Sequence, residues 1–444
     1  MLQHRLRDME MRIPGPQRTI QKRLMLRRFI DPHSHINPLS DGSETLADIL
    51  GYHYYTELVH SAGVPRGDLE EDDLPPDELV KRIAFKLPDL RNMPQLAWLD
   101  ELMFDFFGFD ERIGPNNWQA AFDAAQSKMI QDDWSQQVID QSNLTHVMLT
   151  NDFDDDLSQL RDGFYIPCLR CDDLVFKLTI QATRERLKAC TDVEIGDLSS
   201  MRKALGHRFD FFKKSGAKAC AISTPFWFAP TKIDDAKLNQ LITRCCKGDE
   251  LNSEEQRLLS SGIFWEITKK ASEFQLPFDL MIGVTRGTYS NGVFQGQDLF
   301  NKVVSLEQYA PLFNAFPQVN FPVSVLASTS NQELVANGWI LPNVIMNGHW
   351  WYSNLPCYIR PDLSARLQGV PISKLCGYYT DMYKLEFGRP KFKMYLRVLA
   401  QVLYEDFFVN QGWSVDHCVD LADQLLIHNP ARIFNIETES SCDG

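Results

Sequence analysis

The sequence predicts an α/β protein built on a (β/α)8 TIM barrel. Three observations lead to this prediction: the chain has 444 residues, it contains eight short apolar segments of strand length, and helical patterns follow the later ones. Near-continuous apolar strands that alternate with helices are typical of a parallel sheet covered on both sides. Eight such units close a barrel, whose functional groups lie at the carboxyl ends of the strands.

The eight expected strands run along almost the whole chain, and helical periodicity separates the later ones. The strands are expected at 27–33, 145–152, 163–170, 217–223, 278–285, 320–328, 343–348 and 374–381. Helical patterns follow at 305–316, 331–339 and 391–408.

One long interval departs from this rhythm. Between about 37 and 144, apolar residues recur with helical spacing and no segment has the pattern of a strand. We therefore expect a helical insertion after the first strand, lying over the barrel mouth. A second helical excursion, at about 229–275, follows the fourth strand. The barrel itself is expected at 29–436, with an N-terminal extension at 1–28 and a C-terminal tail at 437–444.

Composition excludes several classes of protein. The 45 basic and 59 acidic residues give a net charge of −14, which argues against a nucleic-acid partner. No apolar stretch is long enough for a transmembrane helix, and the N-terminus lacks the apolar core of a signal peptide. The ten cysteines follow no disulfide framework, so we expect reduced thiols and a cytoplasmic protein. Cys168 and Cys171 could ligate zinc, but no second pair stands at a suitable spacing.

Two histidines stand at the end of the first expected strand. His33 and His35 are two residues apart, so in an extended chain both imidazoles point to the same side. Neutral imidazoles at this spacing are good ligands for zinc and similar divalent ions. Asp31 is a candidate partner that orients them, and Asp381 ends the last strand, where it could complete the metal site. The alternatives are one buried and one exposed histidine, and an Asp381 that only caps a helix.

The stretch RFIDPHSHINP, residues 28–38, is followed by LGYHYYTELVHSAGVP, residues 50–65. Together they resemble the opening of the uronate isomerases, also called glucuronate isomerases, of the amidohydrolase superfamily. NMPQLAWLDELMFDFFGF, IGVTRG, MNGHWWYSN, GYYTDMY and NPARIFNI are similar to later motifs of that family and follow in the same order. The resemblance covers about 29–436 and implies a TIM barrel of the metal-dependent hydrolase type.

The resemblance implies an aldose–ketose isomerase, which is an intramolecular oxidoreductase. The type reaction converts D-glucuronate to D-fructuronate in glucuronate catabolism, by proton transfer between C2 and C1. That chemistry needs a base, stabilisation of an enediolate, and cations that hold the C6 carboxylate. The implied cofactor is a divalent metal ion that is optional for the reaction, with zinc as the first candidate. The implied partner is a small sugar acid, and a homo-oligomer is expected from base rates alone.

Residue by residue, the resemblance assigns roles to positions of this chain. His33, His35 and Asp381 match the metal site, and Tyr54 and Asp381 are the candidates for proton transfer. Substrate-binding roles fall to Arg170, Arg286, Arg389, His349, Trp350 and Trp351. An exposed salt bridge is the alternative for Arg170 and Arg286. For Tyr54 the alternative is an aromatic residue of a helix surface that packs under the insertion, and for the two tryptophans it is packing in the core.

The sequence departs from the family pattern at several polar positions. Tyr52 and Tyr383 replace an aspartate and an arginine, while Ala221, Ile222 and Met281 stand where polar side chains are expected on the middle strands. These changes leave two alternatives open. One is a metal-dependent hydrolase in which Asp381 moves a proton. The other is a barrel without catalysis that binds a sugar acid.

Overall fold

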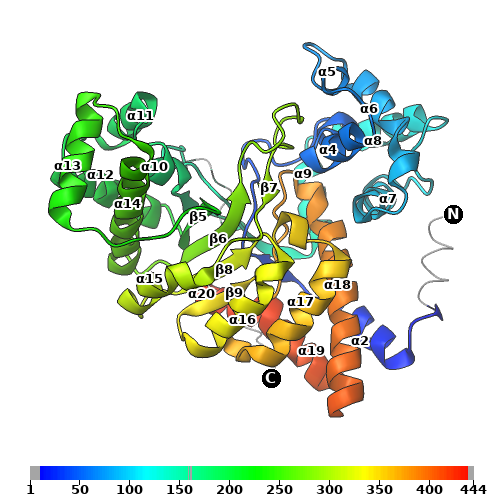
Figure 1. Cartoon of the computed structure of the whole chain (residues 1–444). Helices are drawn as coiled ribbons and strands as arrows, with labels where there is room; N and C mark the ends of the chain where they lie inside the picture. The colour runs from blue at the N-terminus through cyan, green and yellow to red at the C-terminus, as the bar shows by residue number, and fades with distance from the viewer. Residues whose placement is uncertain (1–10, 159, 161–162, 439–444) are drawn as a thin grey trace.

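The computed structural model describes residues 11–158, 160 and 163–438. It shows a barrel flanked by two groups of helices (Figure 1). Most of the expected N-terminal extension is described, whereas residues 1–10 and the end of the expected tail, residues 439–444, lie outside the described residues.

All eight expected strands are confirmed, although most of the observed strands are shorter than the segments predicted from the sequence. Their bounds are β1 Phe29–Asp31, β2 Leu144–Met148, β3 Tyr165–Ile166, β4 Cys168–Arg170, β5 Ala219–Pro225, β6 Phe278–Thr285, β8 Phe321–Val325, β9 Val344–Asn347 and β10 Leu375–Cys376. The third expected strand is divided into β3 and β4 by Pro167, which has no N–H to offer the ladder. The short strand β7, Leu299–Phe300, was not expected and pairs antiparallel with β6.

The strands of the barrel are parallel and lie in chain order. One sheet runs β10-β9-β8-β6-β5-β4 and the other β1-β2-β3. Between β10 and β1, the barrel is joined beyond the strand ends. There the Asp381 N–H donates to the His33 carbonyl at 3.2 Å, and the His35 N–H donates to the Met382 carbonyl at 2.8 Å. The two ends of the barrel therefore meet at the predicted metal-site residues.

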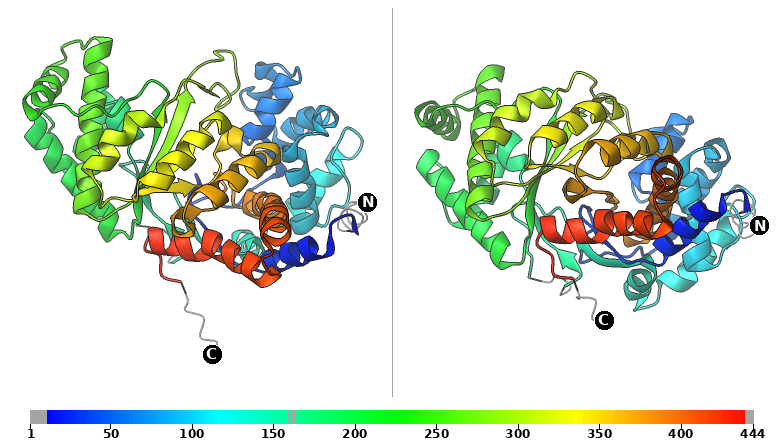
Figure 2. Two further views of the ribbon diagram at one scale, coloured as in Figure 1. Left: turned by 60° about the horizontal axis from the view of Figure 1, so that its bottom comes forward. Right: turned by 90° about the horizontal axis from the view of Figure 1, so that it is seen from below.

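Helices enclose the barrel, as the sequence predicts. Those after β4 are α10 Asp172–Phe176, α11 Gln181–Thr191, α12 Leu198–Lys214, α13 Asp235–Lys247, α14 Ser253–Glu273, α15 Ala310–Ala315, α16 Asn331–Ile340, α17 Pro356–Gly369, α18 Gly388–Val402, α19 Val415–Asp423 and α20 Asn429–Ile433. Before β1, the helix α2 Gly15–Met25 packs on α18 and α19, and Figure 2 shows it beside the C-terminal helices. Strand residues that include Ile30, Ala219 and Ile345 form a separate buried cluster with Ile433 and Phe434 near the C-terminus.

The expected helical insertion is present. It consists of α3 Leu46–Leu50, α4 His53–Ser61, α5 Arg66–Leu69, α6 Pro76–Ala84, α7 Pro94–Phe107, α8 Trp118–Met129 and α9 Trp134–Ser142, with no strand between β1 and β2. Helix α7 packs on α18, and α4 lies near the loop that joins β6 to β7 (Figure 1). At that loop, the ring of Tyr289 stacks on His60 of α4, with centroids 5.7 Å apart. The insertion therefore reaches the rim of the barrel.

Candidate active site

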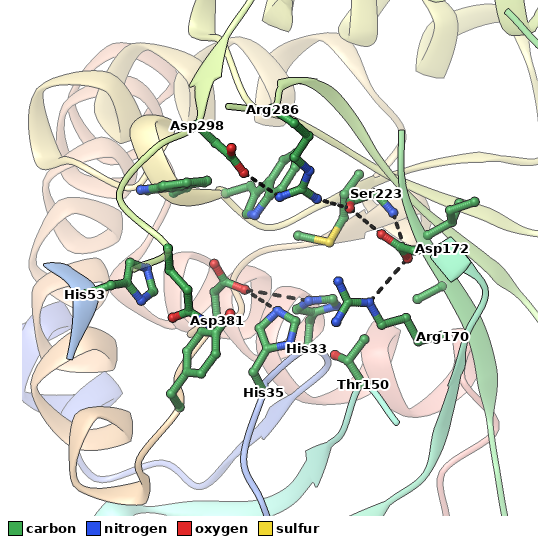
Figure 3. Close-up of a pocket in the computed structure, with 17 residues that line it drawn as sticks. His33, His35, His53, Thr150, Arg170, Asp172, Ser223, Arg286, Asp298 and Asp381 are labelled. Atoms are coloured by element: carbon green, nitrogen blue, oxygen red, sulfur yellow. Dashed lines mark hydrogen bonds and ion pairs between the residues drawn. The ribbon is translucent and has the colours of Figure 1, made fainter. Parts of the chain in front are cut away.

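A cavity of about 180 Å³ opens at the carboxyl ends of the strands (Figure 3). Its lining comes from the strands β4, β5 and β6, from the loops after β1, β2, β6, β9 and β10, and from the helices α4 and α10. The lining residues are His33, His35, His53, Thr150, Arg170, Asp172, Ala221, Ile222, Ser223, Met281, Arg286, Gln295, Asp298, Trp350, Trp351, Asp381 and Tyr383. Most of the residues that the sequence singles out thus meet in one place.

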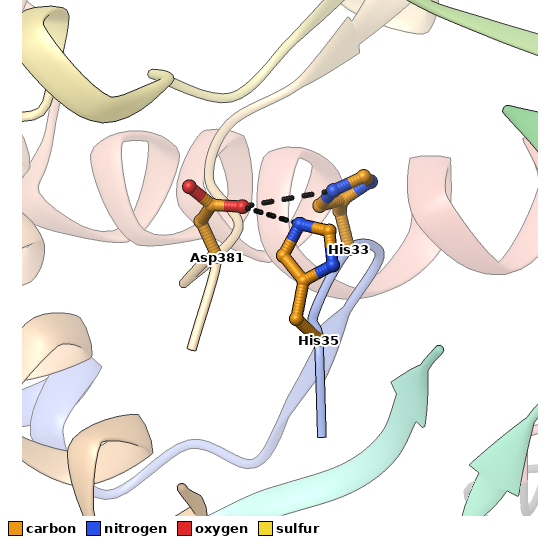
Figure 4. Close-up of side chains that lie close together, drawn as sticks. All are labelled: His33, His35 and Asp381. Atoms are coloured by element: carbon orange, nitrogen blue, oxygen red, sulfur yellow. Dashed lines mark ion pairs between the residues drawn. The ribbon is translucent and has the colours of Figure 1, made fainter. Parts of the chain in front are cut away.

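We call His33, His35 and Asp381 the histidine corner (Figure 4). His35 Nε2 lies 3.3 Å from Asp381 Oδ1, and His33 Nε2 lies 3.6 Å from the same oxygen. Asp381 has a left-handed backbone, with φ at 54°, which a non-glycine residue adopts at a cost of about 1–3 kcal/mol. Such strain persists only where surrounding contacts fix it, and it clusters at functional sites.

The charges of the corner follow from burial and mutual contact. Burial raises the pKa of Asp381, but the hydrogen bond and charge of His35, together with His33, outweigh it and leave the pKa lowered. Burial lowers the pKa of His35. For His33, burial acts in the same direction, but the hydrogen bond to Asp279 outweighs it and the pKa is raised. Asp381 is therefore held as a carboxylate, ready to accept a proton or bind a cation.

Two buried carboxylates support the corner. Asp279 of β6 lies 3.3 Å from His33 Nδ1 and accepts a hydrogen bond from Asn347 at 3.1 Å, so it fixes the orientation of the His33 ring. The sequence suggested Asp31 for that task. Instead Asp31 accepts from the N–H and hydroxyl of Thr380, at 3.0 and 2.5 Å, and supports the backbone next to Asp381. Asp31 orients the carboxylate side of the corner rather than a ring.

The donor set of the corner fits a divalent metal ion. One ligand atom from each of the three residues lies within 4.8 Å of the others. His33 Nε2 is buried and has no hydrogen-bond partner in the described part of the chain, which is unusual unless a further group binds there. Two imidazoles and a carboxylate suit zinc and similar ions. Residues 11–158, 160 and 163–438 contain no other such group of three, so Cys168 and Cys171 have no third ligand.

Across the cavity lies what we call the arginine side: Arg170, Asp172, Ser223, Arg286 and Asp298. Arg286 donates to Asp298 and to the Ser223 hydroxyl, both at 2.7 Å. Ser223 in turn donates to Asp172 at 2.6 Å, and Arg170 lies 3.4 Å from the same carboxylate. Both guanidinium groups line the cavity and keep access to solvent (Figure 3). This side can bind an anion such as a carboxylate.

The remaining walls are aromatic and apolar. Trp350 and Trp351 line the cavity, as the sequence suggests, and Tyr383 stacks on His35 with ring centroids 4.7 Å apart. Met281 of β6 lies in the floor, and the two β5 residues Ala221 and Ile222 accompany it. None of these three floor side chains is a histidine, lysine or carboxylate. These three positions therefore supply no charged group to a second metal ion.

Three residues expected at the site lie outside the cavity lining. Tyr54 is buried beside Tyr52 and His53, because consecutive helical residues differ by about 100° and only His53 faces the cavity. His349 is buried, and neither of its ring nitrogens has a hydrogen-bond partner among the described residues. Arg389 pairs with Asp105 at 2.8 Å and lines a separate cavity, outside the lining of this one, so its expected contact with substrate stays a prediction.

The structure also adds residues that the sequence did not single out. His53 lines the cavity, and burial lowers its pKa to about 3, so its ring is neutral. Asp279 could have been suspected, because it is an aspartate in an apolar strand and shares a face with Met281 two residues on. Asp172 follows directly on Arg170 and Cys171. Asp298 has no comparable signal, since it lies in a loop that returns to the cavity only in the folded chain.

A parallel (β/α)8 barrel with a His-x-His pair after the first strand and an aspartate after the last belongs to the metal-dependent amidohydrolase type. Within that type, the model of the glucuronate isomerase family matches residues 28–425. The chain therefore belongs to the glucuronate isomerase family, and it is an enzyme of the aldose–ketose isomerase class. No helix among the described residues has the length and apolar character needed to cross a membrane.

This chain is similar to known uronate isomerases over most of their length, which supports the assignment. A uronate isomerase of Lactococcus lactis is 23% identical over 410 residues, covering 84% of this chain and 85% of the relative. The crystal structure of a uronate isomerase from Thermotoga maritima is similar with a TM-score of 0.88, covering 95% and 98% of the two chains at 18% identity. A glucuronate isomerase from Caulobacter crescentus has a TM-score of 0.85 at 17% identity, with 96% of each chain covered. The predicted fold class is confirmed.

Proposed function

We propose that this enzyme isomerises a hexuronate of the D-glucuronate type to the corresponding ketose. The observation that carries the proposal is the pairing, in one cavity, of the histidine corner with the arginine side. A uronate needs both features, because it has a carboxylate at C6 and a reacting carbonyl at C1. The family and the names of its relatives support the same substrate class.

The C6 carboxylate binds at the arginine side in this proposal. Arg170 and Arg286 each present N–H groups to the cavity, and planar guanidinium groups suit carboxylates through paired hydrogen bonds. Each arginine already has a carboxylate neighbour, Asp172 or Asp298. These neighbours hold the guanidinium groups in place and leave donors free for the substrate.

The C1–C2 end then faces the histidine corner. Asp381 takes the C2 proton, the C2–H bond breaks, and an enediolate forms across C1 and C2. The proton returns to C1, while the proton of the C2 hydroxyl moves to the C1 oxygen, so no atom is lost. His53 is neutral and can donate or accept at these oxygens, and Tyr383 presents its ring at the same wall. Trp350 and Trp351 complete the wall around the sugar, and the ring of Trp351 lies edge-on to His53 with centroids 6.0 Å apart.

A divalent ion is proposed at His33, His35 and Asp381, with zinc as the first candidate. When bound there, the ion supplies positive charge that stabilises negative oxygen at C1 and C2. Removing the metal with a chelator and measuring turnover tests whether the reaction requires the ion.

We also propose a cytoplasmic location. The nine cysteines of the described residues are unpaired, which supports this location. The expected homo-oligomer stays a prediction.

The test is ketose formation from D-glucuronate and D-galacturonate by the purified enzyme, before and after treatment with a chelator. Ketose formation from either sugar supports the proposal. Loss of this activity after chelation, and its recovery when zinc is added, supports the proposed metal site. Cleavage of esters or amides that depends on metal, without turnover of any hexuronate, would favour a hydrolase. If neither activity is found but a hexuronate raises the melting temperature, the protein is a barrel that binds the sugar acid without catalysis.

A further inference from the structure

Lys391 of α18 is a fully buried lysine that the proposed reaction does not use. Among the described residues, no carboxylate lies within ion-pair distance of it. Its Nζ instead lies 4.7 Å from the ring centre of Tyr54 and 5.2 Å from those of Tyr52 and Trp98. Buried lysines are rare unless paired, so a lysine in an aromatic cage calls for a functional reason.

The hydrogen bonds of Lys391 lead directly to the histidine corner. Its ammonium group donates to the carbonyl of Thr380 at 2.8 Å and to the hydroxyl of Tyr52 at 3.2 Å. The Tyr52 hydroxyl in turn donates to the carbonyl of Asp381 at 3.0 Å. Two successive backbone carbonyls, one of them that of the proposed metal ligand, are therefore held from the same side.

These bonds complete a full set around the left-handed residue. Every backbone N–H and C=O of residues 380–382 is hydrogen-bonded, and each partner lies on a different part of the fold or within the turn itself. The partners are Asp31, Lys391, His33, Tyr52, the Thr380 hydroxyl and His35. A residue in this conformation keeps it only when its surroundings over-determine it.

We infer that Lys391 and Tyr52 form a clamp that positions Asp381 to face His33 and His35. The inference rests on the proposed role of Asp381, but the clamp concerns its geometry rather than the identity of the substrate. Tyr52 stands directly before α4, where the family pattern has an aspartate, and Lys391 comes from α18. The clamp therefore also ties the helical insertion to the barrel at the corner.

The test compares Lys391→Met and Tyr52→Phe with the matched control Tyr55→Phe. Tyr55 is a buried tyrosine three residues along the same segment, and its hydroxyl donates to the Gln95 carbonyl at 2.9 Å, away from Asp381. All three variants lose one buried hydrogen-bonding group. Affinity for Zn²⁺ is measured by competition with a chromophoric chelator, in the absence of sugar, alongside the melting temperature.

We expect the two clamp variants to bind Zn²⁺ about 10-fold or more weakly, since groups that orient metal ligands have effects of this size. The control should stay within about twofold, although its melting temperature falls by a similar amount. The clamp variants should also lose kcat while their KM for the uronate changes little, because Arg170 and Arg286 are untouched. Equal Zn²⁺ affinity in the clamp variants and the control would overturn the inference.

A crystal structure of Tyr52→Phe provides a readout that depends neither on metal nor on turnover. This variant removes a single oxygen atom and is the less disruptive of the two. The inference expects the carboxylate of Asp381 to turn away from His35 or its backbone to leave the left-handed region. An unchanged Asp381 in the variant would refute the clamp, whatever the enzyme proves to isomerise.

Discussion

The two sides of the cavity differ first in their access to water. On one side, the side chains of His33 and Asp381 are 2% and 7% exposed. On the other, those of Arg170 and Arg286 are 35% and 51% exposed. The first pair is fixed by buried partners, namely Asp279 for the ring and Asp31 through Thr380 for the carboxylate. The second pair contacts carboxylates that water also reaches.

This difference indicates a division of labour. Removing one member of a buried charged pair leaves the other without compensation, so the geometry of the histidine corner has little freedom. Ion pairs that water reaches contribute only about 0–1 kcal/mol, so the guanidinium donors that Asp172 and Asp298 leave free can bind and release a substrate carboxylate at little cost. The corner is suited to holding a reactive geometry, and the arginine side to repeated binding and release.

The largest expected effect comes from breaking the corner. Asp381→Asn keeps the size of the side chain but removes its charge and its capacity to accept a proton. We expect kcat to fall about 100-fold or more, as is usual for a positioned base, with weaker Zn²⁺ binding. Asp172→Asn is the matched control, since it alters a carboxylate in the same cavity. Equal losses of kcat in both variants would contradict the division of labour.

Breaking the arginine side should change binding instead. Arg286→Met removes the charge but keeps much of the apolar stem. We expect KM for the hexuronate to rise about 10-fold, because a charge-assisted hydrogen bond contributes about 1.5–3 kcal/mol before screening by water reduces it. The value of kcat should stay within about threefold, and Arg286→Lys should recover part of the loss. A fall in kcat with constant KM would place Arg286 in the chemical step.

Glu57 of α4 is expected to make the stability of the protein depend on pH. Burial, with the charge of Asp298, raises its pKa to about 8, and its Oε1 has no hydrogen-bond partner among the described residues. The folded chain therefore binds a proton that the unfolded chain releases near its ordinary pKa of 4.5. Stability is lost as pH rises from about 4.5 to 8.

Glu57→Gln removes this titration. Melting temperatures at pH 5 and pH 8.5 should show the variant ahead of the wild type by a larger margin at the higher pH. Lys86 and Asp89 form an exposed ion pair elsewhere in the insertion, and Asp89→Asn serves as a control with no such trend. A constant difference between Glu57→Gln and the wild type across this range would show that Glu57 is ionised in the folded chain.

The smallest effect is expected at the apolar floor. Met281→Leu exchanges side chains of similar volume and costs under about 1.5 kcal/mol of stability. Zn²⁺ affinity should not change, and kcat/KM should stay within about threefold, as measured by the same ketose assay. A large loss of Zn²⁺ affinity would show that the Met281 sulfur contributes to the corner, and the contrast between polar corner and apolar floor would fail.

The sequence was informative where local periodicity and order along the chain carry the signal. Each of the eight strands lies within its expected segment or overlaps it, and the helical insertion is present between β1 and β2. His33 and His35 share a face because alternate residues of an extended chain do so. The order of motifs along the chain indicated the family before any geometry was known.

Only the tertiary structure decided which neighbouring side chain reaches the cavity. It selected His53 over Tyr54, turned Arg389 toward Asp105, and brought Asp279 and Asp298 to the site from β6 and the loop beyond it. The physical reason is that periodicity fixes faces within one element, whereas the docking of a helix or loop depends on packing between segments far apart in the chain. The left-handed conformation of Asp381 likewise depends on tertiary packing, because its hydrogen-bond partners come from distant parts of the sequence.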